Sequence, residues 1–144
     1  MATIKRILVP TDLSQLSQVA FDYAATFAKH HRATIYLVHV MEPAPAMVPT
    51  ALGISTDAFE KRMVKEASAA LDRLAQRFGK NVKPVLRRGN VAQELLKAAK
   101  STKANLIVMS THGRSGIGHV LVGSVAEKIV RQARCPVLTV KPTR

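Results

Sequence analysis

Short runs of apolar residues alternate along the chain with longer stretches in which apolar residues recur every three or four positions. Several of the short runs are rich in β-branched residues, which favours strands. The longer stretches follow the 3.6-residue period of helices that bury one face. This pattern predicts strands over residues 4–10, 33–40, 82–88, 105–110 and 135–141, and helices over 15–31, 57–78, 91–101 and 124–133.

Loop and cap residues separate these elements. Residues 41–55 contain three prolines and one glycine, a composition that predicts a loop with no element of its own. Polar residues that are typical caps precede two of the helices. Ser14 or Ser17 is expected to cap the first helix, and Asp57 the second.

Strands and helices are expected to alternate throughout, which is typical of an α/β fold with a parallel sheet between helices. The runs at 4–10 and 105–110 are almost continuously apolar, as strands buried on both faces should be. Pro84 and Pro136 fall in the third and fifth strands, and proline is tolerated at sheet edges because it has no N–H to donate. With right-handed crossovers, we predict one domain over residues 1–144. It is an open, parallel five-stranded sheet of order 3-2-1-4-5 with helices on both faces, a Rossmann-like architecture.

The strand order reverses between the first and fourth strands, and open α/β sheets bind ligands at such a switch point. The segments that follow these two strands are PTD at residues 10–12 and STHG at residues 110–113. Four of the seven glycines lie between Gly113 and Gly123, just before the last helix. Glycine lets the backbone approach a ligand closely, and a helix N-terminus attracts anions. A phosphate site is the predicted use of this segment, with a ligand-free turn or a mobile lid as the alternatives.

Length and composition fit this architecture. A chain of 144 residues has the size of one ordinary domain, and 47% apolar residues can supply its core. No apolar run approaches the ~18 residues of a membrane span, and the N-terminus lacks the apolar core of a signal peptide. Cys135 is the single cysteine, so a disulfide framework is excluded. These features predict a cytoplasmic protein with no membrane partner.

The net charge is strongly positive. A formal value of +13 comes from 22 Lys and Arg residues against nine Asp and Glu residues. Such an excess can indicate an anionic partner, including nucleic acid. The basic residues are spread along the chain without a long block, and aromatic residues do not alternate with them as a base-stacking surface requires. A solvated surface is the preferred interpretation, and a nucleic-acid partner is not expected.

The glycine segment matches neither the P-loop nor the dinucleotide-binding pattern. Residues 109–141, MSTHGRSGIGHVLVGSVAEKIVRQARCPVLTVK, instead resemble the C-terminal signature of the universal stress protein family. RILVPTDLS at residues 6–14 resembles the first strand and loop of that family, and the order of elements agrees over the whole chain. The resemblance implies an adenine-nucleotide α-hydrolase-like fold and a regulator or sensor in the stress response. It implies no enzymatic activity beyond slow ATP hydrolysis.

The ATP-binding branch of this family carries the pattern G-x-x-G-x9-G-[ST], which aligns here with Ser110, Gly113, Gly123 and Ser124. Three of the four positions fit, and Ser110 stands in place of the first glycine. The resemblance therefore implies a bound adenine nucleotide: ATP, or else AMP or a cyclic nucleotide. Mg²⁺ would be held by the phosphates and by Ser124.

The resemblance also assigns roles to individual residues. Those that would surround the adenine and the ribose are Pro10, Thr11, Asp12, Val40, Met109 and Ser110. Those that would hold the phosphates, or belong to the same glycine loop, are Gly113, Arg114, Gly116, Gly123, Ser124 and Val125. A homodimer paired through the C-terminal strand, residues 136–141, and an unidentified regulatory protein partner are implied as well.

Several of these side chains also have a purely structural interpretation. Ser124, with Glu127 three residues later, has the pattern of a capping box, so its hydroxyl can cap the last helix. Asp12 can satisfy N–H groups of its own loop, and His112 is expected to brace a loop. His39 is expected either to lie in the core or to anchor a loop. No paired carboxylates, triad or metal cluster indicates a catalyst. Two alternatives stay open: an interaction module of the same fold that binds no nucleotide, and a basic protein associated with nucleic acid.

Overall fold

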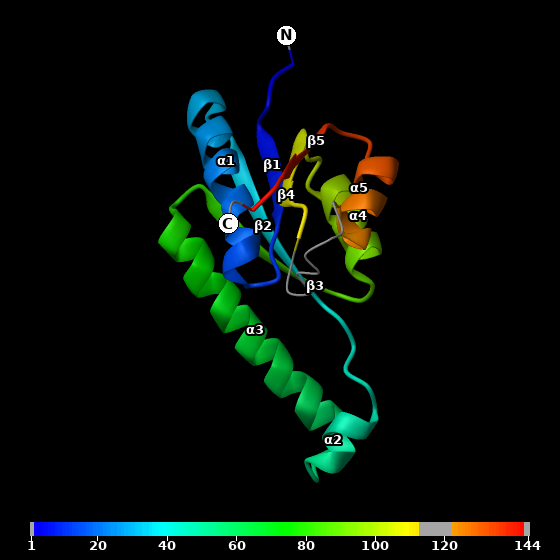
Figure 1. Cartoon of the computed structure of the whole chain (residues 1–144). Coiled ribbons are helices and arrows are strands. Elements are labelled where there is room, and N and C mark those ends of the chain that lie inside the picture. Colours follow the sequence, from blue (N-terminus) through cyan, green and yellow to red (C-terminus); the bar gives the residue numbers. More distant parts are fainter. Residues whose placement is uncertain (1, 113–121, 143–144) are drawn as a thin grey trace.

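The computed structural model describes residues 2–112 and 122–142, and these form an alternating α/β chain (Figure 1). Its strands are β1 (Arg6–Pro10), β2 (Thr34–Met41), β3 (Val82–Arg88), β4 (Leu106–Ser110) and β5 (Val137–Val140). Its helices are α1 (Gln15–His31), α2 (Met47–Ala51), α3 (Thr56–Phe78), α4 (Val91–Ser101) and α5 (Ser124–Gln132). No helix in the described part of the chain is long and apolar enough to cross a membrane.

The five strands form one parallel sheet in the order β3-β2-β1-β4-β5, which confirms the predicted topology. Helices α1 and α3 cover one face of this sheet, and α4 and α5 cover the other (Figure 1). Alternate residues of β1 therefore enter different cores: Ile7 and Val9 pack with α1 and α3, while Leu8 packs with α4 and α5. All three are fully buried, as expected for the central strand.

Proline marks both edges of the sheet, as predicted. Pro84 lies within β3 at one edge, and Pro136 directly precedes β5 at the other. The Pro136 carbonyl still accepts a bond from the Ile107 N–H of β4, at 3.0 Å. A proline at either place costs no ladder bond, because its missing N–H would face away from the neighbouring strand or lie outside the strand.

Residues 41–55 do not form a plain loop, because they contain the short helix α2. Pro49, the third residue of this helix, is buried. Proline is compatible with a first helical turn, where the backbone N–H groups have no acceptor within the helix. Helix α2 and the N-terminal part of α3 extend away from the sheet (Figure 1), and Met47 and Leu52 are 77% and 61% exposed there.

The helix caps differ from the predicted ones in two of three places. Ser14 caps α1 by accepting from the Ser17 N–H, as predicted. Ser55, and not Asp57, caps α3, because its hydroxyl accepts from the Ala58 N–H at 3.1 Å. The cap of α5 is Gly123, which makes Ser124 the first helical residue and leaves the helix without a side-chain cap bond. The capping-box interpretation of Ser124 is therefore wrong.

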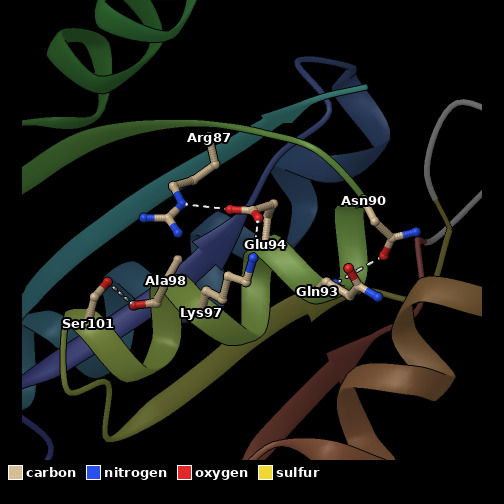
Figure 2. A network of polar contacts seen from close by, with 7 residues as sticks. All are labelled: Arg87, Asn90, Gln93, Glu94, Lys97, Ala98 and Ser101. Atoms are coloured by element: carbon tan, nitrogen blue, oxygen red, sulfur yellow. Dashed lines mark hydrogen bonds and ion pairs between the residues drawn. The ribbon is translucent and has the colours of Figure 1, made fainter. Parts of the chain in front are cut away.

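A network of charged side chains ties β3 to α4 (Figure 2). Glu94 accepts from Arg87 Nε and from Lys97 Nζ, each at 3.0 Å, and its side chain is only 12% exposed. The hydrogen bond from Lys97 lowers the pKa of Glu94 below its ordinary value, with Arg87 adding to the effect against the opposing cost of burial. Nearby, Asn90 caps α4 by accepting from the Gln93 N–H at 3.1 Å (Figure 2).

Candidate nucleotide-binding cleft

A cleft of about 750 Å³ opens at the carboxyl ends of β1, β2 and β4. Its floor is made by the last residues of these strands, and its walls by α3, by the β1–α1 loop and by the N-terminus of α5. This position is the switch point of the sheet, where the chain passes from β1 to β2 on one side and β4 lies on the other. The cleft therefore lies where a ligand was predicted.

The β1–α1 loop is held by a chain of hydroxyl groups. Ser17 Oγ donates to the Ser14 carbonyl at 2.9 Å, so Thr11 Oγ1, 3.0 Å away, donates to Ser17 Oγ. Thr11 Oγ1 in turn accepts from the Leu13 N–H at 3.0 Å. Asp12 accepts from both the backbone N–H and the hydroxyl of Ser14. The predicted structural role of Asp12 is thus present, and the same bonds fix its carboxylate at the mouth of the cleft.

His39 connects the floor of the cleft to this loop. Its Nδ1 lies 2.8 Å from the Thr11 carbonyl, so Nδ1 carries the proton and donates. The Thr11 N–H also donates to the Val38 carbonyl at 2.8 Å, which fastens the loop to β2 twice. Leu13 has a φ of +66°, and this backbone conformation is energetically unfavourable for a residue with a branched side chain. Of the two roles expected for His39, the structure shows the loop anchor, since the residue is only partly buried.

On the other side of the cleft, the end of β4 is closed by a tight turn. Ser110 Oγ donates to the His112 carbonyl at 2.8 Å and accepts from the His112 N–H at 3.3 Å. Thr111 Oγ1 lies 2.8 Å from His112 Nδ1, which agrees with the expected bracing role of that histidine. The Thr111 carbonyl accepts from the Gly123 N–H at 2.9 Å and so fixes where α5 begins.

The start of α5 presents backbone donors to the cleft. The first bond of the helix runs from the Glu127 N–H to the Gly123 carbonyl at 3.0 Å. The N–H groups of Ser124, Val125 and Ala126 therefore have no acceptor within the helix, and all three residues line the cleft. Their partial positive charge and the helix dipole favour an anion at this point.

The universal stress protein family model matches residues 3–141, nearly the whole chain. The chain belongs to this family. A universal stress protein of Methanocaldococcus jannaschii is 35% identical over 140 residues, which cover 95% of this chain and 82% of that relative. The resemblance found from the glycine segment and the first strand is therefore confirmed at the level of the family.

Solved structures of universal stress proteins share the fold. A universal stress protein in complex with cAMP superposes with a TM-score of 0.71 at 22% identity, covering 96% of this chain and 98% of the other. The universal stress protein of Archaeoglobus fulgidus in complex with dAMP gives a TM-score of 0.63 at 20% identity, covering 98% and 100%. Both of those proteins bind an adenine nucleotide with one phosphate.

Nine of the twelve residues predicted for the site line the same cleft: Pro10, Thr11, Asp12, Val40, Met109, Ser110, Gly123, Ser124 and Val125. They come from the ends of three strands, the loop after β1 and the start of one helix, and they are spread along the chain from Pro10 to Val125. The other three, Gly113, Arg114 and Gly116, lie outside the described residues.

The wall formed by α3 was missed. Met63, Glu66, Ala67 and Ala70 line the cleft from this helix. The periodicity that predicts a helix over residues 57–78 does not show that part of it borders a ligand site. The signal that was available is the length of α3. A helix of 23 residues is longer than β1 and β2, which have five and eight residues, so its first turns must extend past the carboxyl ends of the strands.

Few ionisable side chains in the described residues line the cleft. Its carboxylates are Asp12, Glu42 and Glu66, and no group of three or more potential ligands able to hold a metal ion occurs within residues 2–112 and 122–142. Cys135 lies outside the cleft beside the α4–α5 core, and burial raises the pKa of its thiol, which makes it a poor nucleophile.

Proposed function

We propose that this universal stress protein binds an adenine nucleotide in the cleft and acts as a nucleotide-dependent regulator or sensor in the stress response. One observation carries the proposal: the donor N–H groups of α5 and the carboxyl ends of β1 and β4 meet in one cleft of about 750 Å³. Membership of the family and the adenine nucleotides bound by two relatives of the same fold support it.

The adenine and ribose would occupy the side of the cleft between β1 and β2. Here the Val40 backbone would meet the adenine edge, and Asp12, held by Ser14, would accept a hydrogen bond from the base or the ribose. Met109 and Ser110 would lie beside the ribose at the end of β4. Because the Ser110 hydroxyl already bonds to the backbone of His112, the ribose would meet a small side chain and no free hydroxyl.

The phosphates would lie at the start of α5, against the N–H groups of Ser124 and Val125. The glycine loop with Gly113, Arg114 and Gly116 would complete this part of the site. ATP is the proposed ligand, with AMP or a cyclic nucleotide as the alternatives. Mg²⁺ would neutralise charge on the phosphates. Ser124 at the start of α5 would assist it, and the residues described in the structure offer no cluster of ligands that would hold the ion alone.

We propose binding, and not turnover, as the activity. Phosphate loss from bound ATP needs a positioned water or base as well as charge stabilisation. The two candidates in the cleft already have structural partners, His112 with Thr111 and Asp12 with Ser14, and we assign neither of them to the activation of water. Hydrolysis would therefore be slow, and the occupied and empty states would differ in what they present to a protein partner.

We further propose a homodimer paired through β5. The two edges of the sheet differ: β3 carries Lys83, Pro84 and Arg88, devices that discourage strand pairing, whereas Val137 and Leu138 of β5 are only half-buried. Contact about a two-fold axis would place the two β5 strands antiparallel and join two sheets into one.

Mass spectrometry of the freshly purified, denatured protein tests the nucleotide proposal. We expect adenine nucleotide released in up to one equivalent per chain, and its mass distinguishes ATP from AMP and from a cyclic nucleotide. The result counts against the proposal if no nucleotide is released and none binds when it is added to the protein after dialysis. The protein would then be an interaction module of this fold without a nucleotide.

A further inference from the structure

The end of the molecule opposite the cleft collects positive charge. The amino ends of the strands and the C-terminal ends of α1, α4 and α5 meet there, at the top of Figure 1. Hydrogen bonds join three of the segments: the Lys5 carbonyl accepts from the Thr34 N–H at 2.9 Å, and Arg6 Nε donates to the Lys103 carbonyl at 2.8 Å. We call this surface the basic end, and its cations are Lys5, Arg6, Lys29, Arg32, Lys100, Lys103 and Arg134.

The stretches of sequence that carry the basic-end cations contain no acidic residue. The chain has no Asp or Glu before Asp12, between Asp22 and Glu42, or between Glu94 and Glu127. The six ion pairs of the described residues all use cations outside the basic end. Every basic-end cation except Arg6 is largely exposed, so this surface presents unneutralised charge to solvent.

Two of these cations occupy backbone positions that favour glycine. Arg32 follows α1 with a φ of +53°, and Lys103 follows α4 with a φ of +52°. Both helices end in the same motif, in which the N–H of the next residue donates to the carbonyl five residues earlier: Ala33 to Ala28, and Ala104 to Ala99. Glycine is the common residue at this position. The helix dipole does not explain why Arg32 and Lys103 stand at these positions in place of glycine, because the last turns of the two helices already contain the cations Lys29 and Lys100.

We infer that the basic end binds the phosphate backbone of double-stranded nucleic acid without sequence preference. Phosphate contacts of this kind need only Lys, Arg and backbone donors. Single strands are a poorer match, because they require aromatic side chains for stacking, and the last turns of α1, α4 and α5 expose none; Tyr23 of α1 is exposed but lies about two turns before the end of that helix. An anionic membrane is also a poorer match, since among the described residues the last turns of α1, α4 and α5 expose one large apolar side chain, Val130, and binding at a lipid surface needs a wider apolar face.

The test is a fluorescence anisotropy titration of a labelled DNA duplex of about 20 base pairs, between about 50 and 200 mM salt. The variant is Arg32→Gly with Lys103→Gly. It removes two cations and relieves two positive φ angles, so the fold should keep or raise its melting temperature. The control is Lys65→Gln with Lys128→Gln, which removes the same charge from exposed sites outside the basic end.

We expect the glycine variant to bind the duplex about tenfold more weakly or worse, with a shallower dependence on salt, and the control to stay close to the wild type. A single strand of the same sequence should bind more weakly than the duplex. Added ATP with Mg²⁺ should not displace the bound duplex. The inference is overturned by equal losses in both variants, by tighter binding of the single strand, by displacement with ATP, or by binding to phosphatidylserine vesicles without binding to the duplex.

Discussion

Gly123 shows how backbone packing can require a glycine in a site that also suits a ligand. Its φ of −68° is open to any residue, so conformation is not the reason. A Cβ at this position would lie 3.0 Å from the Thr111 carbonyl oxygen, closer than ordinary contacts. The glycine is therefore explained by the approach of β4 to the start of α5, whether or not a phosphate is bound.

The first prediction concerns this contact. Gly123→Ala should lower the free energy of unfolding by roughly 1–3 kcal/mol, because backbone atoms must move apart to admit the Cβ. The neighbouring control Ser124→Ala should change it by less than about 0.5 kcal/mol, since the Ser124 hydroxyl makes no cap bond. Urea denaturation measures both. Equal stability of the two variants would show that Gly123 is not needed for packing.

The second prediction concerns Ser110, which replaces a glycine of the ATP-binding family pattern. Its hydroxyl makes two bonds to the backbone of His112. Ser110→Gly should therefore lower the free energy of unfolding by about 1 kcal/mol while nucleotide affinity stays the same or rises. Parallel urea and calorimetric titrations separate the two effects, and a large loss of affinity would assign the hydroxyl to the ligand.

At the scale of elements, the sequence predicted most of the fold because local signals and topology agree. The continuous apolar runs placed β1 and β4 at the centre, and the prolines placed β3 and β5 at the edges. The local signals did not identify the N-cap residue of a helix where more than one residue was suitable. Ser55 and Asp57 are both plausible caps for α3, and only packing decides between them. Helix α2 was missed because Pro49 looks like a helix breaker, although a first turn tolerates it.

The third prediction concerns the link between β3 and α4. The pKa of Glu94 is lower in the folded protein than its ordinary value of 4.5. Its pairing therefore stabilises the protein at pH values above 4.5, and this stabilisation is lost as the pH falls through the native pKa. Glu94→Gln should therefore be less stable than the wild type at pH 7, with the difference shrinking below about pH 4.5. The midpoints of urea denaturation, measured for both proteins across this pH range, test the sign of the stability difference. A difference that does not depend on pH would mean that charge at Glu94 is unimportant.

The fourth prediction tests pairing through β5. Because the carbonyls of Pro136 and Val140 face β4, the N–H of Thr139 faces away from it, toward the proposed partner strand. Thr139→Pro should therefore abolish the dimer without removing a bond to β4, whereas Thr139→Ala should remain dimeric. Light scattering measures the molar mass. A monomeric wild type, or a dimeric proline variant, contradicts the proposed interface.

At the scale of the whole molecule, the fold brings together what the sequence separates. The switch-point rule placed the site at the ends of β1 and β4, and nine predicted residues do line the cleft there. The wall from α3 was missed, because its position depends on how a long helix crosses the sheet. The basic residues looked dispersed along the chain, yet several gather at one end, since strand starts and helix ends of an α/β fold share a side. Spacing along a sequence does not show such a surface.

The most direct test of the nucleotide site is a calorimetric titration of ATP with Mg²⁺ into the wild type, Ser124→Glu and Ser124→Gln. A glutamate at the first position of α5 favours the helix dipole, so the fold should be kept, but its charge repels a phosphate. We predict binding to the wild type, a loss of at least tenfold, about 1.4 kcal/mol, for Ser124→Glu, and a smaller loss for the uncharged Ser124→Gln. Absence of binding to the wild type, or undiminished binding by Ser124→Glu, would contradict the phosphate site at the start of α5.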